Sequence, residues 1–186
     1  MRAQQARQLY LEHKPYQGDA LDRHCQRLAA FTLLQAELNG VELDPDFVAA
    51  TTWLHDIGLL VKLEGTRNYL DRGLRFVEPL VDSWGLPDHQ RRVFEEMMLY
   101  NHAARPVQGV CEEAELMRRA VQVEHSFGVV THGLDRARVR EVFGQHPRRG
   151  LTPVLLDFGR ITVLHDGPGQ LWHIFRPKLR DSPAAS

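Results

Sequence analysis

The sequence predicts an all-α protein folded as a single domain. Its 186 residues are enough for one domain with a substantial hydrophobic core. Apolar residues recur at spacings of three and four along most of the chain, as on one face of a helix, and no stretch alternates apolar and polar residues like a half-buried strand. We expect a helical bundle over residues 19–176, an N-terminal helix or arm over residues 1–18, and a disordered tail over residues 177–186.

Two helices are predicted in the first third of the bundle. Asp19 is a typical N-cap, and the helix over residues 19–38 is closed by Asn39-Gly40, because glycine readily adopts the left-handed conformation past a helix end. Asp44-Pro45 begins the second helix, with aspartate as the cap and proline at the first helical position. That helix is expected to end at His55-Asp56, shortly before a glycine.

The remaining helices are predicted from the same spacings and from their first residues. A helical pattern covers residues 65–83, with Pro79 inside it as a kink or an end. Leu86-Pro87-Asp88 starts another helix, and acidic residues from Glu112 complement the positive end of the next helix dipole. The apolar face of that helix is expected to contain Leu116, Ala120, Val123, Phe127 and Val130. Two shorter helices are expected over residues 135–143 and 152–164.

Charge and composition exclude several classes of protein. The formal net charge is −1 and the basic residues form no long run, which argues against a nucleic-acid or anionic-membrane surface. Cys25 and Cys111 lie far apart, so neither a disulfide framework nor a zinc ribbon is expected. The N-terminus has no apolar targeting core and no stretch approaches a membrane span, so we expect a cytoplasmic protein.

Ten histidines is a high count for this length, and three of them are expected to face inward from separate helices. His24 lies at the edge of the apolar stripe of its helix, His55 stands beside Asp56 at a helix end, and His102 follows Met98 by about one turn. Imidazole nitrogen and carboxylate oxygen together suit Zn²⁺, Mn²⁺ or Fe²⁺, and carboxylate-rich sites suit Mg²⁺. The sequence therefore predicts a site for a divalent metal ion of undetermined identity.

His24 and the segment Leu54-His55-Asp56-Ile57-Gly58 resemble, in type and order, the first two motif elements of the HD-domain superfamily of metal-dependent phosphohydrolases. Residues 118–128 look like a segment of a little-characterised HD subgroup, as do Asn68-Tyr69-Leu70 and residues 101–106. The resemblance covers roughly residues 20–145. It implies an all-α bundle that binds a divalent metal, although related HD enzymes catalyse other reactions, so the fold does not fix the chemistry.

One position departs from the family pattern. The last metal-binding aspartate of the family falls on Val121, which cannot bind a metal, and a second aspartate of the subgroup falls on Glu124. At about 100° per residue, Glu124 lies roughly 80° from the centre of the apolar stripe and Val121 roughly 140°. Two interpretations stay open: Glu124 replaces the missing ligand, or Glu124 is solvated and the site has lost a ligand.

The remaining candidates would act on the substrate. Asp56 would both bind the metal and orient the attacking water, and His102 is the candidate general acid. Lys62, Arg67 and Arg105 follow the two key segments and could clamp a phosphate, although each also fits an ordinary surface cation. Two other features are interpreted as structural: His165-Asp166 as a helix terminus, and Arg148-Arg149 as solvated surface.

Three functions remain open, in this order. The first is a metal-dependent phosphohydrolase acting on a nucleotide or another small phosphoester. The second is a non-phosphate HD enzyme, such as a hydratase, a lyase or an iron oxygenase; a di-iron site is disfavoured, because His89 is the only histidine between Asp56 and His102 and is poorly placed. The third is a degenerate module that binds a ligand without turnover, which Val121 would explain.

Overall fold

The computed structural model describes residues 1–14 and 18–177. All regular secondary structure in these residues is helical, which confirms the all-α prediction. Part of the predicted tail, residues 178–186, lies outside the described residues. The α-helices are α1 (Arg2–His13), α2 (Ala20–Asn39), α3 (Pro45–Leu54), α4 (Tyr69–Ser83), α5 (Asp88–Tyr100), α6 (Glu112–His125), α7 (Arg136–Gln145), α8 (Leu151–Asp166) and α9 (Pro168–Phe175); a short 3-10 helix, η1, covers Ile57–Leu59.

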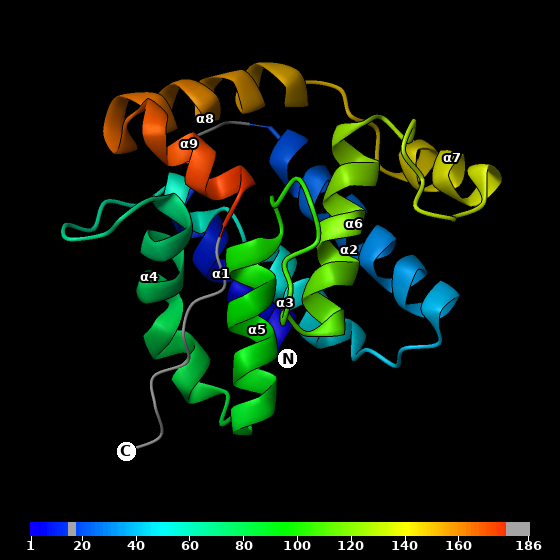
Figure 1. Cartoon of the computed structure of the whole chain (residues 1–186), viewed down its shortest axis with the longest axis horizontal. Coiled ribbons are helices and arrows are strands. Elements are labelled where there is room, and N and C mark those ends of the chain that lie inside the picture. The colour runs from blue at the N-terminus through cyan, green and yellow to red at the C-terminus, as the bar shows by residue number, and fades with distance from the viewer. Residues whose placement is uncertain (15–17, 178–186) are drawn as a thin grey trace.

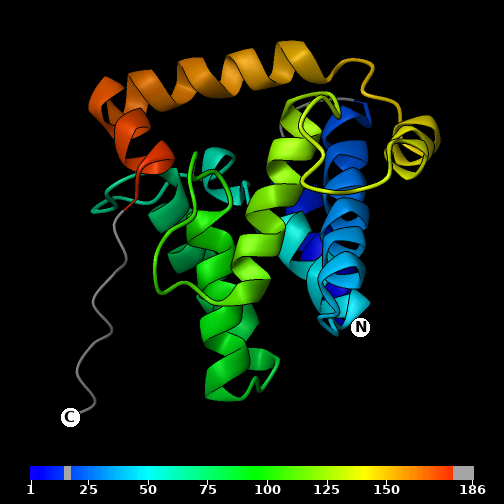
Figure 2. The same cartoon turned by 45° about the vertical axis from the view of Figure 1, so that its right-hand side comes forward.

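The helices form one bundle with a two-helix cover. Helix α2 packs against α3 and α6, α6 packs against α5, and α5 packs against α4, while α1 packs against α3. Helix α8 crosses one end of this bundle, and α9 turns back from its end (Figures 1 and 2). Helix α7 lies beside α2. The site described below lies where α2, α3, α5 and α6 approach the covering helices.

Local signals account for the C-terminal end of α2 and for the start of α3. Helix α2 ends at Gly40, which has a φ of 69° and donates its backbone N–H to the last carbonyls of the helix. The Asp44 side chain accepts from the backbone N of Asp46, with Pro45 at the first helical position. Both boundaries agree with the sequence prediction to within two residues.

Helix α4 begins later than predicted. Gly65 has a φ of 71° and lies in a turn, and the helix starts only at Tyr69, where the Asn68 side chain caps the backbone N of Asp71. Pro79 lies inside the helix, which continues to Ser83, so the proline does not end it. The predicted helix start at residue 65 was wrong because the capping side chain, Asn68, lies three residues further along.

Helix α6 ends earlier than predicted. Its last residue is His125, and the backbone N–H of Gly128 returns to the carbonyl of Val123, which closes the helix. Phe127 therefore leaves the apolar face on which it was expected: it has a φ of 58°, its side chain is 63% exposed, and the Arg148 guanidinium lies 3.9 Å from its ring centroid. Val130 is exposed as well.

Helix α1 belongs to the packed core. Ala6 and Tyr10 are buried, and the Tyr10 ring lies 5.2 Å from that of Trp53 on α3. Asp46, at the start of α3, accepts hydrogen bonds from the backbone N of Arg2 and Ala3 at 3.0 and 3.2 Å, so it satisfies the first donors of α1. Within the segment predicted as an N-terminal helix or arm, α1 thus packs against the bundle.

Polar contacts hold α8 and α9 against the bundle. Asp166, at the end of α8, accepts from Arg72 Nη1 at 2.9 Å and from the backbone N of Tyr69 at 3.0 Å. The Phe175 carbonyl, at the end of α9, accepts from the backbone N of Ala104 at 2.8 Å. Helix α9 was not predicted. Within the described part of the chain, no helix combines the length and apolarity needed to cross a membrane.

Candidate metal centre

His24 and His55 meet in the interior between α2 and the end of α3. Each is 1% exposed, and their Nε2 atoms lie 3.3 Å apart. The Oδ2 atom of Asp56 lies 3.0 Å from His55 Nε2 and 3.9 Å from His24 Nε2. Three side chains that were predicted as metal ligands therefore converge, and these three atoms are close enough together to share one ion.

The contacts of the Nδ1 atoms of His24 and His55 indicate which nitrogen of each imidazole is available to bind a metal. His55 Nδ1 lies 2.8 Å from the Thr52 carbonyl oxygen, which can only accept a hydrogen bond. His24 Nδ1 lies 3.2 Å from Glu124 Oε1, at an angle short of a regular hydrogen bond. Since both partners are acceptors, they suit tautomers with the proton on Nδ1, and these tautomers leave both Nε2 lone pairs available to a metal. Two facing lone pairs beside a carboxylate fit a cation.

Charge interactions within this group centre on the Asp56 carboxylate. Burial alone would lower the pKa of His55, but the adjacent Asp56 carboxylate outweighs it and raises the pKa. Burial would raise the pKa of Asp56, yet His55 and His102 hold it well below its usual range. Asp56 therefore stays ionised, which is the state in which a carboxylate binds a metal.

The turn that carries Asp56 is fixed by close packing at Gly58. A Cβ atom at this position would overlap the Tyr69 carbonyl oxygen and lie 2.6 Å from the backbone N of Gly73. Gly58 lies within η1 and has no left-handed φ, so it does not serve as the helix-ending residue that we predicted. A glycine is required because the backbone of α4 passes directly against it.

His102 lies on the other side of Asp56. Asn101, which is fully buried, donates to the carbonyls of Met97 and Met98 and so holds the turn after α5. His102 Nε2 then lies 3.3 Å from Asp56 Oδ1. One carboxylate oxygen thus faces the histidine pair and the other faces the candidate general acid.

Glu124 is completely buried, so the interpretation that it is solvated was wrong. Its Oε1 atom accepts from Arg27 Nη2 at 2.6 Å and Nε at 3.0 Å, and its Oε2 atom lies 3.0 Å from Arg148 Nη1. Burial would raise the pKa of Glu124, but His24, His125 and Arg27 lower it. Arg148, predicted as solvated surface, is only 13% exposed and belongs to this network.

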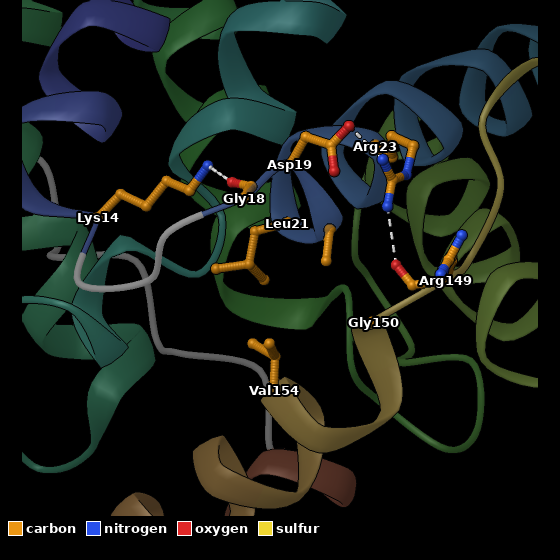
Figure 3. Close-up of a pocket in the computed structure, with 9 residues that line it drawn as sticks. Lys14, Gly18, Asp19, Leu21, Arg23, Arg149, Gly150 and Val154 are labelled. Atoms are coloured by element: carbon orange, nitrogen blue, oxygen red, sulfur yellow. Dashed lines mark hydrogen bonds and ion pairs between the residues drawn. The ribbon is translucent and has the colours of Figure 1, made fainter.

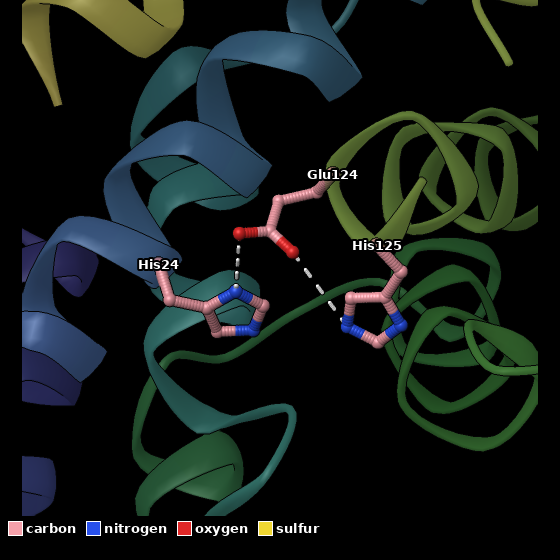
Figure 4. A group of neighbouring side chains, drawn as sticks. All are labelled: His24, Glu124 and His125. Atoms are coloured by element: carbon pink, nitrogen blue, oxygen red, sulfur yellow. Dashed lines mark ion pairs between the residues drawn. The ribbon is translucent and has the colours of Figure 1, made fainter. Parts of the chain in front are cut away.

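Glu124 contacts His24 at Nδ1 (Figure 4). His55 lies at Nε2, the other nitrogen of the ring. The side chains therefore form two candidate groups that share His24: His24 with His55 and Asp56, and His24 with Glu124 and His125. In the second group, Arg27 and Arg148 already neutralise Glu124 and repel a further cation. The first group is therefore the better metal site, and the role of Glu124 as a ligand stays a prediction.

His125 is a member of the cluster that sequence reasoning missed. Its Nε2 atom lies 3.7 Å from Glu124 Oε2, and its ring lies 5.5 Å from that of His102. Partial burial, with the neighbouring imidazoles of His102 and His24, lowers its pKa to about 3. At about 100° per residue, His125 falls roughly opposite Leu116 on the helix. It still faces the site because α6 is packed on two sides, by α2 and by α5. The same two-sided packing buries Val121.

A cavity of about 220 Å³ opens above the cluster. Asp56, Tyr69, His102 and His125 line its floor, and α8 and α9 supply most of its wall with residues that include Leu155, Phe158, Ile174 and Phe175. Lys62, Arg67 and Arg105 are exposed, and none of these predicted phosphate-binding residues belongs to the cavity lining in the part of the chain that is described. Arg67 instead lies 3.9 Å from Asp71.

A larger cavity of about 460 Å³ lies near the start of α2 and contains none of the histidines (Figure 3). Two of the cations that line it, Lys14 and Arg23, are already engaged. Lys14 pairs with Asp22, and Arg23 pairs with Asp19 and donates to the carbonyl of Arg149 at 2.7 Å. His165-Asp166 is a helix terminus, as predicted, since α8 ends at Asp166.

Comparisons of the chain with protein-family models, with curated proteins and with solved structures give no match. The resemblance to the HD-domain superfamily thus rests on the motif residues quoted above and stays a prediction. The all-α fold and the convergence of His24, His55 and Asp56 are independent of it.

Proposed function

We propose that this protein is a metal-dependent hydrolase whose metal ion is held by His24, His55 and Asp56. The observation that carries the proposal is the pair of Nε2 atoms, 3.3 Å apart and next to an ionised carboxylate, in two rings whose Nδ1 atoms face acceptors. Three protein ligands are the number found in catalytic zinc sites, which leave a further position for water or substrate. This number favours an enzyme over the degenerate module.

When bound, a divalent ion would lower the pKa of a water molecule and polarise the bond under attack. Asp56 stays ionised and can orient that water through a hydrogen bond. Hydrolysis adds the hydroxyl of the water to the attacked centre and needs one proton for the leaving group. His102, 3.3 Å from Asp56 and at the floor of the cavity, is the group placed to donate that proton.

Metal analysis of protein purified without a tag tests whether the protein binds a metal ion at the proposed site. The wild-type chain should contain a stoichiometric divalent metal, and His55→Ala should lose both the metal and any hydrolytic activity. His89→Ala is the matched control, because His89 is an exposed histidine on α5 and should leave both unchanged. A His55→Ala variant that retains its full metal content would refute the proposed site.

The bond that is hydrolysed is a separate question from the metal. A phosphoester was predicted from the resemblance, with Lys62, Arg67 and Arg105 as the clamp, but these three side chains are exposed and lie outside the described lining of the cavity. His102→Ala should lower the rate for whichever substrate class is hydrolysed, with bound metal retained. A loss of metal in His102→Ala would instead assign this histidine to metal binding.

A further inference from the structure

Gly159 occupies an unusual place in the wall of the cavity. It lies in the interior of α8 on the stripe formed by Leu155, Phe158 and Thr162, which all line the cavity. A Cβ atom at Gly159 would meet nothing within 4 Å, and its φ is not left-handed. Neither backbone conformation nor close packing requires glycine here, although glycine inside a helix costs about 0.5–1 kcal/mol relative to alanine. Gly159 itself is exposed, and its missing side chain leaves open space on the stripe of the helix that lines the cavity.

The lining around this space is apolar apart from its floor and Thr162 of α8. Leu59, Leu155, Phe158, Ile174 and Phe175 supply the walls, and the lining residues that the structure describes include no lysine or arginine. Asp56 places the candidate metal centre at the floor. A volume of about 220 Å³ is below the roughly 300–1,000 Å³ of ordinary ligand pockets, so the space suits a small molecule.

We propose that this cavity binds the substrate, and that the substrate is a small, non-phosphorylated molecule with an apolar group that fits beside Gly159. The inference rests on the proposed hydrolase function and names its substrate class. An apolar group gains from leaving water against the leucine, isoleucine and phenylalanine walls. Without the metal ion, a phosphate dianion would lose its hydration in a cavity whose described lining has no lysine or arginine to replace it.

Two small probes of similar length separate these possibilities. Butyramide carries an uncharged head, and propyl phosphate carries a dianionic one. Each is titrated into the zinc-loaded protein and into the metal-free protein, and the backbone amide signals of Gly159 and Thr162 are followed by NMR. Butyramide should shift these signals in both forms, and in the metal-free protein its dissociation constant should be at least about tenfold lower than that of propyl phosphate.

Gly159→Leu should fill the space and weaken butyramide binding by about tenfold or more, because a leucine side chain would occupy the volume of the probe. Gly159→Ala should weaken it less. Gly144→Leu is the matched control, since Gly144 is a helical glycine on α7 whose added Cβ also meets nothing within 4 Å, and it should bind butyramide like the wild type. The amide spectrum also reports whether each variant is folded.

Tighter binding of propyl phosphate than of butyramide by the metal-free protein, no shift with butyramide, or unchanged butyramide binding by Gly159→Leu would each overturn the inference. These outcomes are distinguishable from failure of the proposed hydrolase. If the purified protein lacked metal but bound butyramide at Gly159, only the hydrolase proposal would fail. If metal and hydrolysis were found without butyramide binding, only the substrate class would fail.

Discussion

Replacing Glu124 by glutamine removes a buried charge while nearly preserving the shape of the side chain. In the wild type this charge neutralises Arg27, which is fully buried, and Arg148, which is 13% exposed. Breaking a buried ion pair by removing one partner costs about 3–5 kcal/mol. Since the glutamine oxygen can still accept one hydrogen bond, we expect a loss near the lower limit, about 3 kcal/mol. For a chain of this length, that corresponds to a fall in Tm of roughly 6–12 °C.

Urea unfolding of Glu124→Gln, Arg27→Met and the double variant measures the loss and its origin. The double variant should lose less unfolding free energy than the sum of the losses in the two single variants. Each single variant leaves the other charge without its partner, whereas the double variant removes both charges together. Glu37→Gln is the control: Glu37 pairs with Arg138 on the surface and should give no measurable change. Glu124→Gln stability within error of the wild type, or strict additivity with Arg27→Met, would refute the reasoning.

The same variant should respond to pH in a defined direction. The pKa of Glu124 is lowered in the folded protein, so the folded chain keeps this carboxylate charged while the unfolded chain takes up a proton. The stabilisation is therefore fully present above the ordinary glutamate pKa of about 4.3 and is lost as the pH falls below it. The difference in unfolding free energy between wild type and Glu124→Gln should narrow as the pH falls below that value.

Metal affinity then separates the two roles open to Glu124. If Glu124 only orients His24 through Nδ1, glutamine should weaken metal binding by about 10–100-fold, the usual effect of losing a partner behind a ligand. If Glu124 binds the metal itself, the loss should approach that of His55→Ala. Competition with a chelator of known affinity measures the difference.

Three further predictions concern the supports of the site. Gly58→Ala should cost about 3 kcal/mol in urea unfolding, because the added methyl group would overlap the Tyr69 carbonyl; a neutral result would mean that η1 moves freely away from α4. Asp46→Asn should cost about 1 kcal/mol of unfolding free energy at pH 7 and almost nothing near pH 2. The N-terminal ammonium lowers the pKa of Asp46 to about 2, so the stabilisation is lost as the pH falls from about 3.9 toward that value. A difference in unfolding free energy between wild type and variant that stays constant across this range would contradict the prediction. Asp166→Asn should lower the unfolding free energy by about 3 kcal/mol and speed hydrogen exchange in α8, because it removes the charge that pairs with the partly buried Arg72. Unchanged hydrogen exchange would show that other contacts hold the covering helices.

The parts of the molecule that sequence reasoning predicted correctly depend on local rules. The C-terminal end of α2 follows from Gly40, and the start of α3 follows from Asp44-Pro45. The capping preferences of these residues act within a few residues. Once these helices are placed, His24 and His55 need only the packing of α2 on α3 to meet. The all-α fold and this pair were therefore accessible from spacing alone.

The parts that were missed depend on contacts distant in sequence. His125 was missed because a single apolar stripe assumes one buried face, whereas α6 is buried against both α2 and α5. Arg148 lies 24 residues from Glu124, and only the fold brings it to the carboxylate. Helix α9 has eight residues and begins directly after Gly167. Pro168 at its first helical position is a helix-start signal, but we interpreted this segment only as the end of α8.

The replacement of an aspartate by Val121 changes the charge of the candidate centre as well as its number of ligands. In the predicted family pattern, two carboxylates would cancel the charge of a divalent ion. Here Asp56 is the anion in the better group, because the charge of Glu124 is already taken up by Arg27 and Arg148. With neutral histidines, the bound ion would keep a net positive charge facing an apolar cavity, where low polarity strengthens its effect. Such a centre can polarise an uncharged substrate without a second cation, which agrees with walls that lack lysine and arginine among the described lining residues.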